Sequence, residues 1–160
     1  MEFQKRLEKA IERGQRASDA RSRAEHEQAL SEDELRRLHS QYRLHLSEHI
    51  ERCLGELPNH FPGFHVERIF GERGWGAALK RDDLAIQSGK RANFFSRLEV
   101  AIRPYSPLHV LELNAKATVR NKEAYNRTHY SPLAEVDVTS YEELIDLWVL
   151  EFAEIYAVKT

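Results

Sequence analysis

The first 57 residues contain no proline and only two glycines, so this long stretch has almost nothing that would break a helix. Ser31 and Glu34 form a capping box, in which each side chain satisfies a backbone N–H of the other residue at the start of a helix. Pro58 supplies a stop signal. We therefore expect an N-terminal helical hairpin, with helices over about residues 2–29 and 32–57.

Apolar side chains gather on one broad face of the second expected helix, which must be buried. They are Leu35, Leu38, Tyr42, Leu46, Ile50, Cys53 and Leu57. The first helix has a thinner stripe at heptad-like spacing, which Arg21 and Gln28 interrupt. Its members are Phe3, Leu7, Ala10, Gly14, Ala17 and Ala24. The small residues allow a helix to approach closely, either the second helix of the same chain or the first helix of another copy.

From residue 61 the apolar spacing changes from the helical period to the alternation that is typical of strands. The expected strands are residues 64–70, 75–81, 97–103 and 111–120, and the expected loops are residues 82–93 and 121–138, the latter with a helical turn over 123–127. Because no helix separates these four strands, they indicate an antiparallel meander.

The sequence predicts a closing helix that begins at Thr139 or Ser140, each of which is followed three residues later by a glutamate. One face of this helix carries Tyr141, Leu144, Ile145, Trp148, Phe152, Ile155 and Tyr156. We expect this face to cover the apolar side of the sheet. The overall prediction is an α+β protein, with a helical hairpin over residues 1–57 and a four-stranded antiparallel sheet with a C-terminal helix over residues 61–160.

A metal motif stands out on the second helix. Residues His45 to His49 read His-Leu-Ser-Glu-His, which resembles the zinc motif of the inverzincin metalloproteases. The resemblance implies that His45 and His49 bind zinc and that Glu48 is the base. It also requires a third ligand, and Glu99, Glu112 and Glu123 all remain open for that place.

Two other interpretations of these histidines stay open. His49 lies within the apolar stripe and His45 at its edge, which favours histidines at a helix interface. His45, His49 and Cys53 also follow one another at intervals of four residues, so they can hold a soft metal ion between two chains.

Other catalytic signatures are missing from the sequence. A Walker loop, a dinucleotide-binding Gly-x-Gly-x-x-Gly and a Gly-x-Ser-x-Gly elbow are all absent, so we assign no catalytic residue and no cofactor. Cys53 is the single cysteine, which excludes an internal disulfide, and its apolar stripe favours a packing role.

Charge is unevenly distributed although the net charge is only −2. Residues 61–130 carry 12 basic and 7 acidic side chains, whereas residues 131–160 carry 1 basic and 7 acidic ones. The candidate residues for an anionic partner are Arg97, Arg103, Lys116, Arg120, Lys122 and Arg127. Tyrosines nearby can stack on bases, but Glu99 and Glu112 share the same face, so a nucleic acid is not the favoured partner.

These observations favour a non-catalytic interaction or adaptor-like domain that dimerises through its N-terminal helices and presents the basic region to an acidic protein partner. A nucleic-acid-binding module and a metal-dependent hydrolase that uses the histidine motif are the alternatives. No segment approaches the roughly 18 apolar residues of a membrane span, and the first residues lack a signal-peptide core. We therefore expect a cytoplasmic protein that does not bind membranes.

Overall fold

The computed structural model describes residues 2–158, except for the side chains of residues 25–31, 85 and 87. Its helices and strands are α1 (Glu2–His60), β1 (His65–Ile69), β2 (Trp75–Gln87), β3 (Lys90–Ile102), β4 (Val110–Val119), β5 (Lys122–Pro132) and α2 (Val138–Ala157), with short 3₁₀ turns at Gly71–Arg73 and Leu133–Glu135. The chain divides into two compact units, residues 1–37 and residues 38–160, so the boundary lies inside α1.

The N-terminal region is a single helix, and the expected hairpin of two helices is wrong. No glycine or proline occurs between Gly14 and Gly55, so nothing in the backbone forces a turn. A continuing helix also keeps its hydrogen-bond ladder intact, whereas a turn leaves end groups that need caps. The expected capping bond of Ser31 lies outside the described side chains.

Within the first unit, every side chain from Glu2 to Ala24 is exposed. Among them are the large apolar side chains of Phe3, Leu7 and Ile11, which are 76%, 48% and 52% exposed. This part of α1 therefore gains no stability from a hydrophobic core within the described residues.

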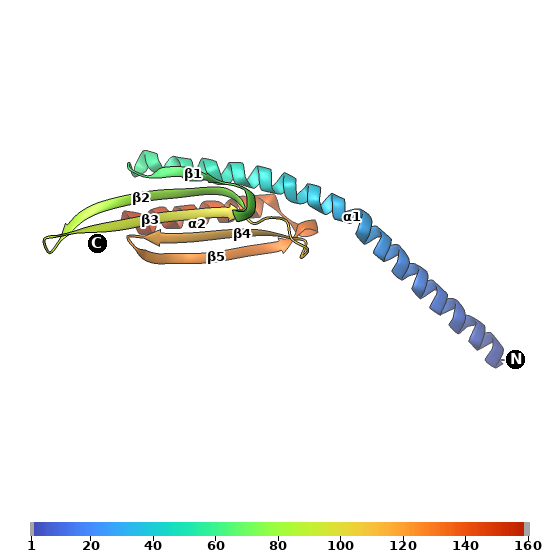
Figure 1. The fold of residues 1–160 in the computed structure, drawn as a ribbon. Coiled ribbons are helices and arrows are strands. Elements are labelled where there is room, and N and C mark those ends of the chain that lie inside the picture. The colour runs from blue at the N-terminus through green and yellow to red at the C-terminus, as the bar shows by residue number, and fades with distance from the viewer. Residues whose placement is uncertain (1, 159–160) are drawn as a thin grey trace. The chain divides into compact units, whose positions relative to one another are not determined.

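The second unit contains an antiparallel sheet of five strands in the order β1-β2-β3-β4-β5 (Figure 1). The α+β class and the meander are confirmed, but four strands had been expected. The additional strand, β5, lies in the segment 121–138 that had been expected to be a loop, and the expected loop at 82–93 forms the distal ends of β2 and β3.

Two tight turns explain both corrections. Ser88 and Gly89 join β2 to β3 with φ angles of 52° and 76°, and Arg120 and Asn121 join β4 to β5 with φ angles of 48° and 70°. Two central residues with positive φ are typical of the type I′ turn, whose twist matches that of paired strands. At each turn the chain therefore reverses within two residues, and the two strands stay paired with each other up to the turn.

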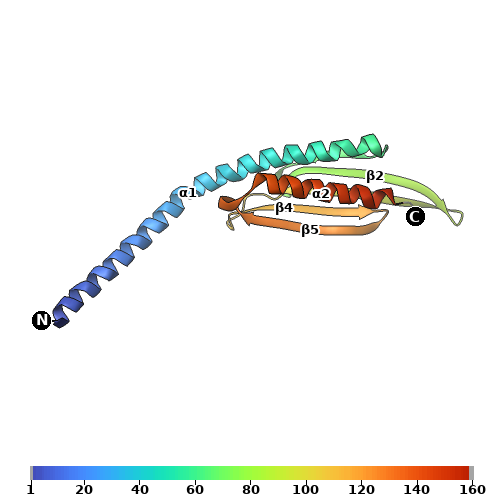
Figure 2. The same cartoon turned by 180° about the vertical axis from the view of Figure 1, so that it is seen from behind.

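The hydrophobic core lies between the sheet and a layer of two helical segments. α2 lies on one face of the sheet and runs along the strands, and residues 38–60 of α1 run alongside α2 (Figure 2). The largest fully buried side chains are Tyr141, Phe152, Leu46, Ile50, Leu54, Leu79, Leu98, Ile102, Leu111, Leu113, Leu133 and Ile145. The expectation that the C-terminal helix covers the sheet is therefore confirmed. None of the helices in the described part of the chain has the length and apolarity needed to cross a membrane.

Polar contacts fix α2 on the sheet. The hydroxyl of Tyr125 donates to the carbonyl of Trp148 at 2.6 Å, and the hydroxyl of Tyr141 donates to the carbonyl of Leu111 at 2.8 Å. Burial raises the pKa of both tyrosines, so these hydroxyls keep their protons and remain donors at neutral pH. These bonds set the position of α2 on the sheet and thus hold its acidic side chains beside α1.

Candidate functional site

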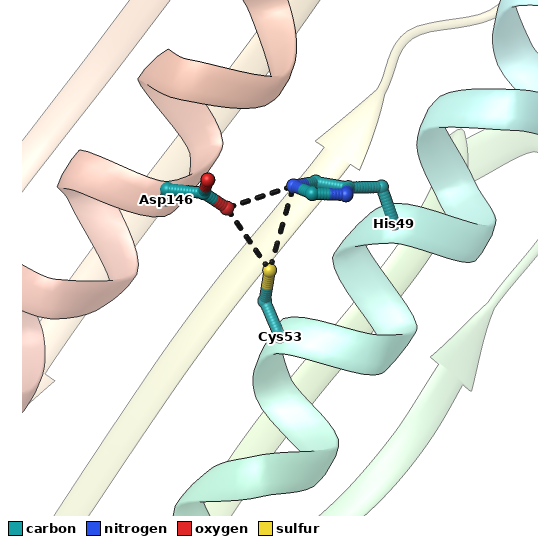
Figure 3. A group of neighbouring side chains, drawn as sticks. All are labelled: His49, Cys53 and Asp146. Atoms are coloured by element: carbon teal, nitrogen blue, oxygen red, sulfur yellow. Dashed lines mark hydrogen bonds and ion pairs between the residues drawn. The ribbon is translucent and has the colours of Figure 1, made fainter.

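Three chemically different side chains meet where α1 and α2 lie side by side. His49 and Cys53 are four residues apart on α1, so both project from the same side of that helix. Asp146 projects toward them from α2 (Figure 3). The group belongs entirely to the second unit, in which the core below it holds both helices in place.

The three ligand-type atoms converge on one point. The Nε2 atom of His49 lies 2.8 Å from Oδ1 of Asp146, and Sγ of Cys53 lies 3.3 Å from the same oxygen. The sulfur is also 3.6 Å from Nε2. In a relay for a nucleophile, histidine uses one ring nitrogen for the nucleophile and the other for the carboxylate. Here a single nitrogen faces both partners, so the arrangement is not such a relay.

The thiol of Cys53 is held in its protonated form. Burial, and then the hydrogen bond to Asp146 and the charge of that carboxylate, raise the pKa of Cys53 from 9.0 to about 12. Because the thiolate is the nucleophilic form of cysteine, Cys53 is a poor nucleophile at neutral pH.

A second carboxylate lies between two histidines. Oε1 of Glu142 is 2.7 Å from Nε2 of His45, and Oε2 is 3.8 Å from Nδ1 of His49. Glu142 precedes Asp146 by one helical turn, just as His45 precedes His49. The two helices thus face each other with two imidazoles on α1 and two carboxylates on α2.

The structure arranges the histidine motif differently from a protease site. His45 and His49 lie at the α1–α2 interface, but their Nε2 atoms face different carboxylates. Glu48 is exposed and lies in neither contact. Of the three carboxylates considered as third ligands, Glu99 and Glu112 lie on the opposite face of the sheet, and none of the three joins His49 among the described residues.

Sequence reasoning named Cys53 as a neighbour of His49 but missed Asp146 and Glu142. The available signal was the spacing of four residues between these two carboxylates on the closing helix, which matches the spacing of the histidines. Using that signal requires knowing that the two helices lie side by side, and periodicity within one helix does not reveal its neighbour.

A largely apolar pocket of about 480 Å³ adjoins the group. It is lined by Cys53, Glu56, Leu57, His60, Phe61, Asp146, Val149, Leu150 and Ala153. Because Cys53 and Asp146 belong to its wall, a small molecule in this pocket can reach the sulfur and the carboxylate.

Three of the six basic residues named from sequence lie on the open face of the sheet. They are Arg97, Arg103 and Lys116. Arg97 pairs with Glu99 at 3.1 Å, and Arg103 pairs with Glu112 at 3.7 Å. A hollow of about 220 Å³ on this face includes Arg103 and Lys116 in its lining.

The structure does not bring the other three basic residues to that surface. Arg120 donates to the carbonyl of Tyr156 on α2 at 2.9 Å. Arg127 forms a two-point ion pair with Glu151, also on α2. Lys122 is exposed at the start of β5, beside the turn that carries Arg120. These three cations lie on or near the helix side of the sheet.

The fold and the site define a class in structural terms: an α+β protein whose antiparallel meander is covered on one face by two helical segments, with a histidine, cysteine and aspartate cluster between them. Comparisons of the chain with protein-family models, with curated proteins and with solved structures find no match.

Proposed function

We propose that the protein is a non-catalytic interaction domain that self-associates through the first part of α1. The observation that carries this proposal is the exposure of every side chain from Glu2 to Ala24, including Phe3, Leu7 and Ile11, in an unbroken helix. Isolated helices in water are marginal, and most helices in proteins are stabilised by packing of an apolar face. A second copy of the same helix supplies such packing.

The continuous helix leaves fewer possible partners for the apolar stripe that runs from Phe3 to Ala24. Of the two partners considered from sequence, the second helix of a hairpin does not exist, because residues 2–60 form one helix. The stripe is also narrow and interrupted by Arg21, so it suits a close contact between small residues such as Ala10 and Gly14 of two chains.

The charges along the helix favour an antiparallel pair. In a heptad register, Arg6 and Glu34 flank the apolar stripe at equivalent positions near opposite ends of the segment. If Phe3 of one copy lies against Leu35 of the second copy, Arg6 lies beside Glu34 of the second copy. A parallel pair places Arg6 beside Ile11 instead and gains no ion pair.

Light scattering coupled to size-exclusion chromatography tests the proposal on the full chain. The variant L7K/A10K places two lysines in the stripe, and the control Q15K/S22K adds the same charge outside the stripe. We expect the wild type and the control to have the mass of a dimer and L7K/A10K that of a monomer.

A monomeric wild-type chain at concentrations of about 100 µM, a range in which weak specific contacts are populated, would overturn the proposal. A dimer that persists in L7K/A10K would show that the apolar stripe is not the contact surface. Because the substituted side chains are exposed, tryptophan fluorescence of Trp75 and Trp148 should show that the second unit stays folded in both variants.

The open sheet face is the surface that we propose for an acidic protein partner. Its hollow includes three basic side chains, Arg73, Arg103 and Lys116, and one carboxylate, Glu99. We expect a labelled polyglutamate probe to bind more weakly to Lys116→Glu than to Lys122→Glu, since Lys122 lies outside this hollow. Equal binding by both variants would remove the face as the site.

A further inference from the structure

We infer that His49, Cys53 and Asp146 form a binding site for one divalent transition-metal ion of the zinc type. The site uses one nitrogen, one sulfur and one oxygen ligand, and their atoms lie within 4.8 Å of one another. This inference is independent of the proposed self-association, because all three residues belong to the second unit.

The distances between the three atoms fit a tetrahedral zinc ion. Usual zinc bond lengths place sulfur about 3.6 Å from either of the other ligands, and nitrogen about 3.3 Å from oxygen, at tetrahedral angles. The observed separations are 3.6 Å for sulfur to nitrogen, 3.3 Å for sulfur to oxygen and 2.8 Å for nitrogen to oxygen. Small side-chain rotations that open the last distance by about half an ångström admit the ion.

The ligand chemistry selects the kind of metal. Thiolate and imidazole favour zinc, cobalt or other borderline ions, whereas magnesium and calcium prefer oxygen alone. Binding converts the thiol of Cys53 to a thiolate and releases its proton to solvent, while the proton on Nε2 of His49 moves to Nδ1 or leaves. Asp146 supplies the negative charge that helps to hold the cation.

Glu142 is placed to orient the histidine. With Nε2 on the metal, Nδ1 of His49 carries the proton and faces Oε2 of Glu142, now 3.8 Å away. Metal-bound histidines usually donate their other N–H to a carboxylate or a carbonyl, which fixes the ring orientation. The hydrogen bond of Glu142 to His45, at 2.7 Å, in turn holds this carboxylate in place.

The adjoining pocket gives the site an entrance and a free coordination position. Three protein ligands leave the fourth position of a tetrahedral ion for water or a small ligand, as in zinc sites that bind exogenous molecules. Cys53 and Asp146 line the pocket of about 480 Å³, so the free position has a route to solvent. Leu57, Phe61 and Val149 line the same pocket, which favours a ligand with an apolar part.

Cobalt(II) is the direct probe, because cobalt bound to thiolate gives an intense charge-transfer band in the near ultraviolet. The full chain, freed of metal with a chelator, is titrated with cobalt and then with zinc in competition with a coloured chelator. We expect one cobalt per chain, the charge-transfer band, and displacement of cobalt by zinc.

Variants assign the ligands. Cys53→Ser should abolish the charge-transfer band, Asp146→Asn should weaken zinc binding at least about tenfold, and Glu142→Gln should weaken it about tenfold through loss of the orienting carboxylate. The controls Glu143→Gln and His65→Asn change an exposed carboxylate on α2 and an exposed imidazole on β1, and should bind as wild type.

Circular dichroism confirms that each variant is folded. If Cys53→Ser proves unstable, Asp146→Asn still tests the site, because it preserves the shape of the side chain. Cobalt uptake without the sulfur band, zinc affinity that is equal in Asp146→Asn and Glu143→Gln, or no stoichiometric uptake by the wild type would each overturn the inference.

Discussion

The two parts of α1 show how differently one helix is stabilised along its length. In residues 2–24 all side chains are exposed, and Leu7 is 48% exposed. In residues 38–60 of the same helix, Leu46, Ile50 and Leu54 are completely buried. Both segments form regular turns of helix, so secondary structure alone does not distinguish them. The first part depends on intrinsic propensity and, in the proposed dimer, on a second copy of the chain, and the second depends on packing within the sheet unit.

Leucine truncations give the largest expected difference between the two parts. Leu54→Ala should lower the free energy of unfolding of the second unit by about 3 kcal/mol, because it removes buried contacts and leaves a cavity. Leu7→Ala should change that value by less than about 0.5 kcal/mol, since the side chain has no core to leave.

Urea unfolding followed by tryptophan fluorescence measures this difference. Trp75 and Trp148 both belong to the second unit, so the signal reports that unit alone. Equal losses of unfolding free energy in Leu54→Ala and Leu7→Ala would show that the two parts of α1 unfold as one cooperative structure. The two parts would then not be stabilised differently.

Two glycines provide a matched pair with a smaller expected effect. A Cβ atom added to Gly14 or to Gly55 meets nothing within 4 Å, so alanine fits at both positions. Alanine stabilises a helix interior by about 1 kcal/mol relative to glycine. Gly55→Ala should therefore raise the unfolding free energy of the second unit by about that amount, whereas Gly14→Ala should raise helix content without moving the tryptophan transition.

Circular dichroism and fluorescence, recorded on the same samples, separate these outcomes. If Gly14→Ala shifts the fluorescence transition as far as Gly55→Ala does, residues 2–37 contribute to the stability of the sheet unit, which the exposure of residues 2–24 argues against.

The same contrast explains what the sequence was able to predict. The strand at Val110–Val119 and the helix at Val138–Ala157 each bury one face, so their apolar residues recur with a clear period and both were predicted. The distal end of the β2–β3 hairpin has no such signal, because Leu84 and Ile86 are 74% and 78% exposed. Sequence patterning reports burial, and it fails where a strand or helix forms without burying a face.

The candidate metal site was half predictable for a related reason. His49 and Cys53 lie on one helix, so their spacing was visible in the sequence. Asp146 is 93 residues further along the chain than Cys53 and meets it only because α2 packs beside α1. Long-range contacts of this kind depend on the sheet that positions both helices, and no local pattern encodes them.

Among the side chains of α1 that the structure describes, His39 is the first buried one, and its ionisation tests where the buried part begins. The side chain is 3% exposed, and its Nε2 atom lies 3.0 Å from the carbonyl oxygen of Arg103. Burial lowers the pKa of His39 below 6.5; the contact with that carbonyl opposes the effect, and the charge of Arg43 adds to it. The folded state thus disfavours protonated His39.

The sign of the pH effect follows from this shift. Below the unfolded pKa of about 6.5 the unfolded chain binds a proton more readily than the folded one, so stability falls as the pH falls. We expect the wild type to lose more stability than His39→Gln between pH values of about 7.5 and 5.5. Parallel urea titrations at the two pH values check this, and equal losses would show that His39 is protonated at no cost in the folded state.

The smallest expected effect concerns the orientation of the exposed part of α1 in a dimer. Each exposed ion pair contributes roughly 0.2–1 kcal/mol, so Arg6→Glu and Glu34→Arg should each weaken dimerisation by a few fold. In an antiparallel pair the double variant R6E/E34R restores the ion pairs and thus the dimerisation constant, and added salt reduces the differences among all four proteins. A parallel pair predicts no restoration, because Arg6 and Glu34 then lie far apart. Sedimentation at several protein concentrations distinguishes the two arrangements, and a double variant weaker than both single ones would exclude the antiparallel pair while leaving the exposed stripe as the contact surface.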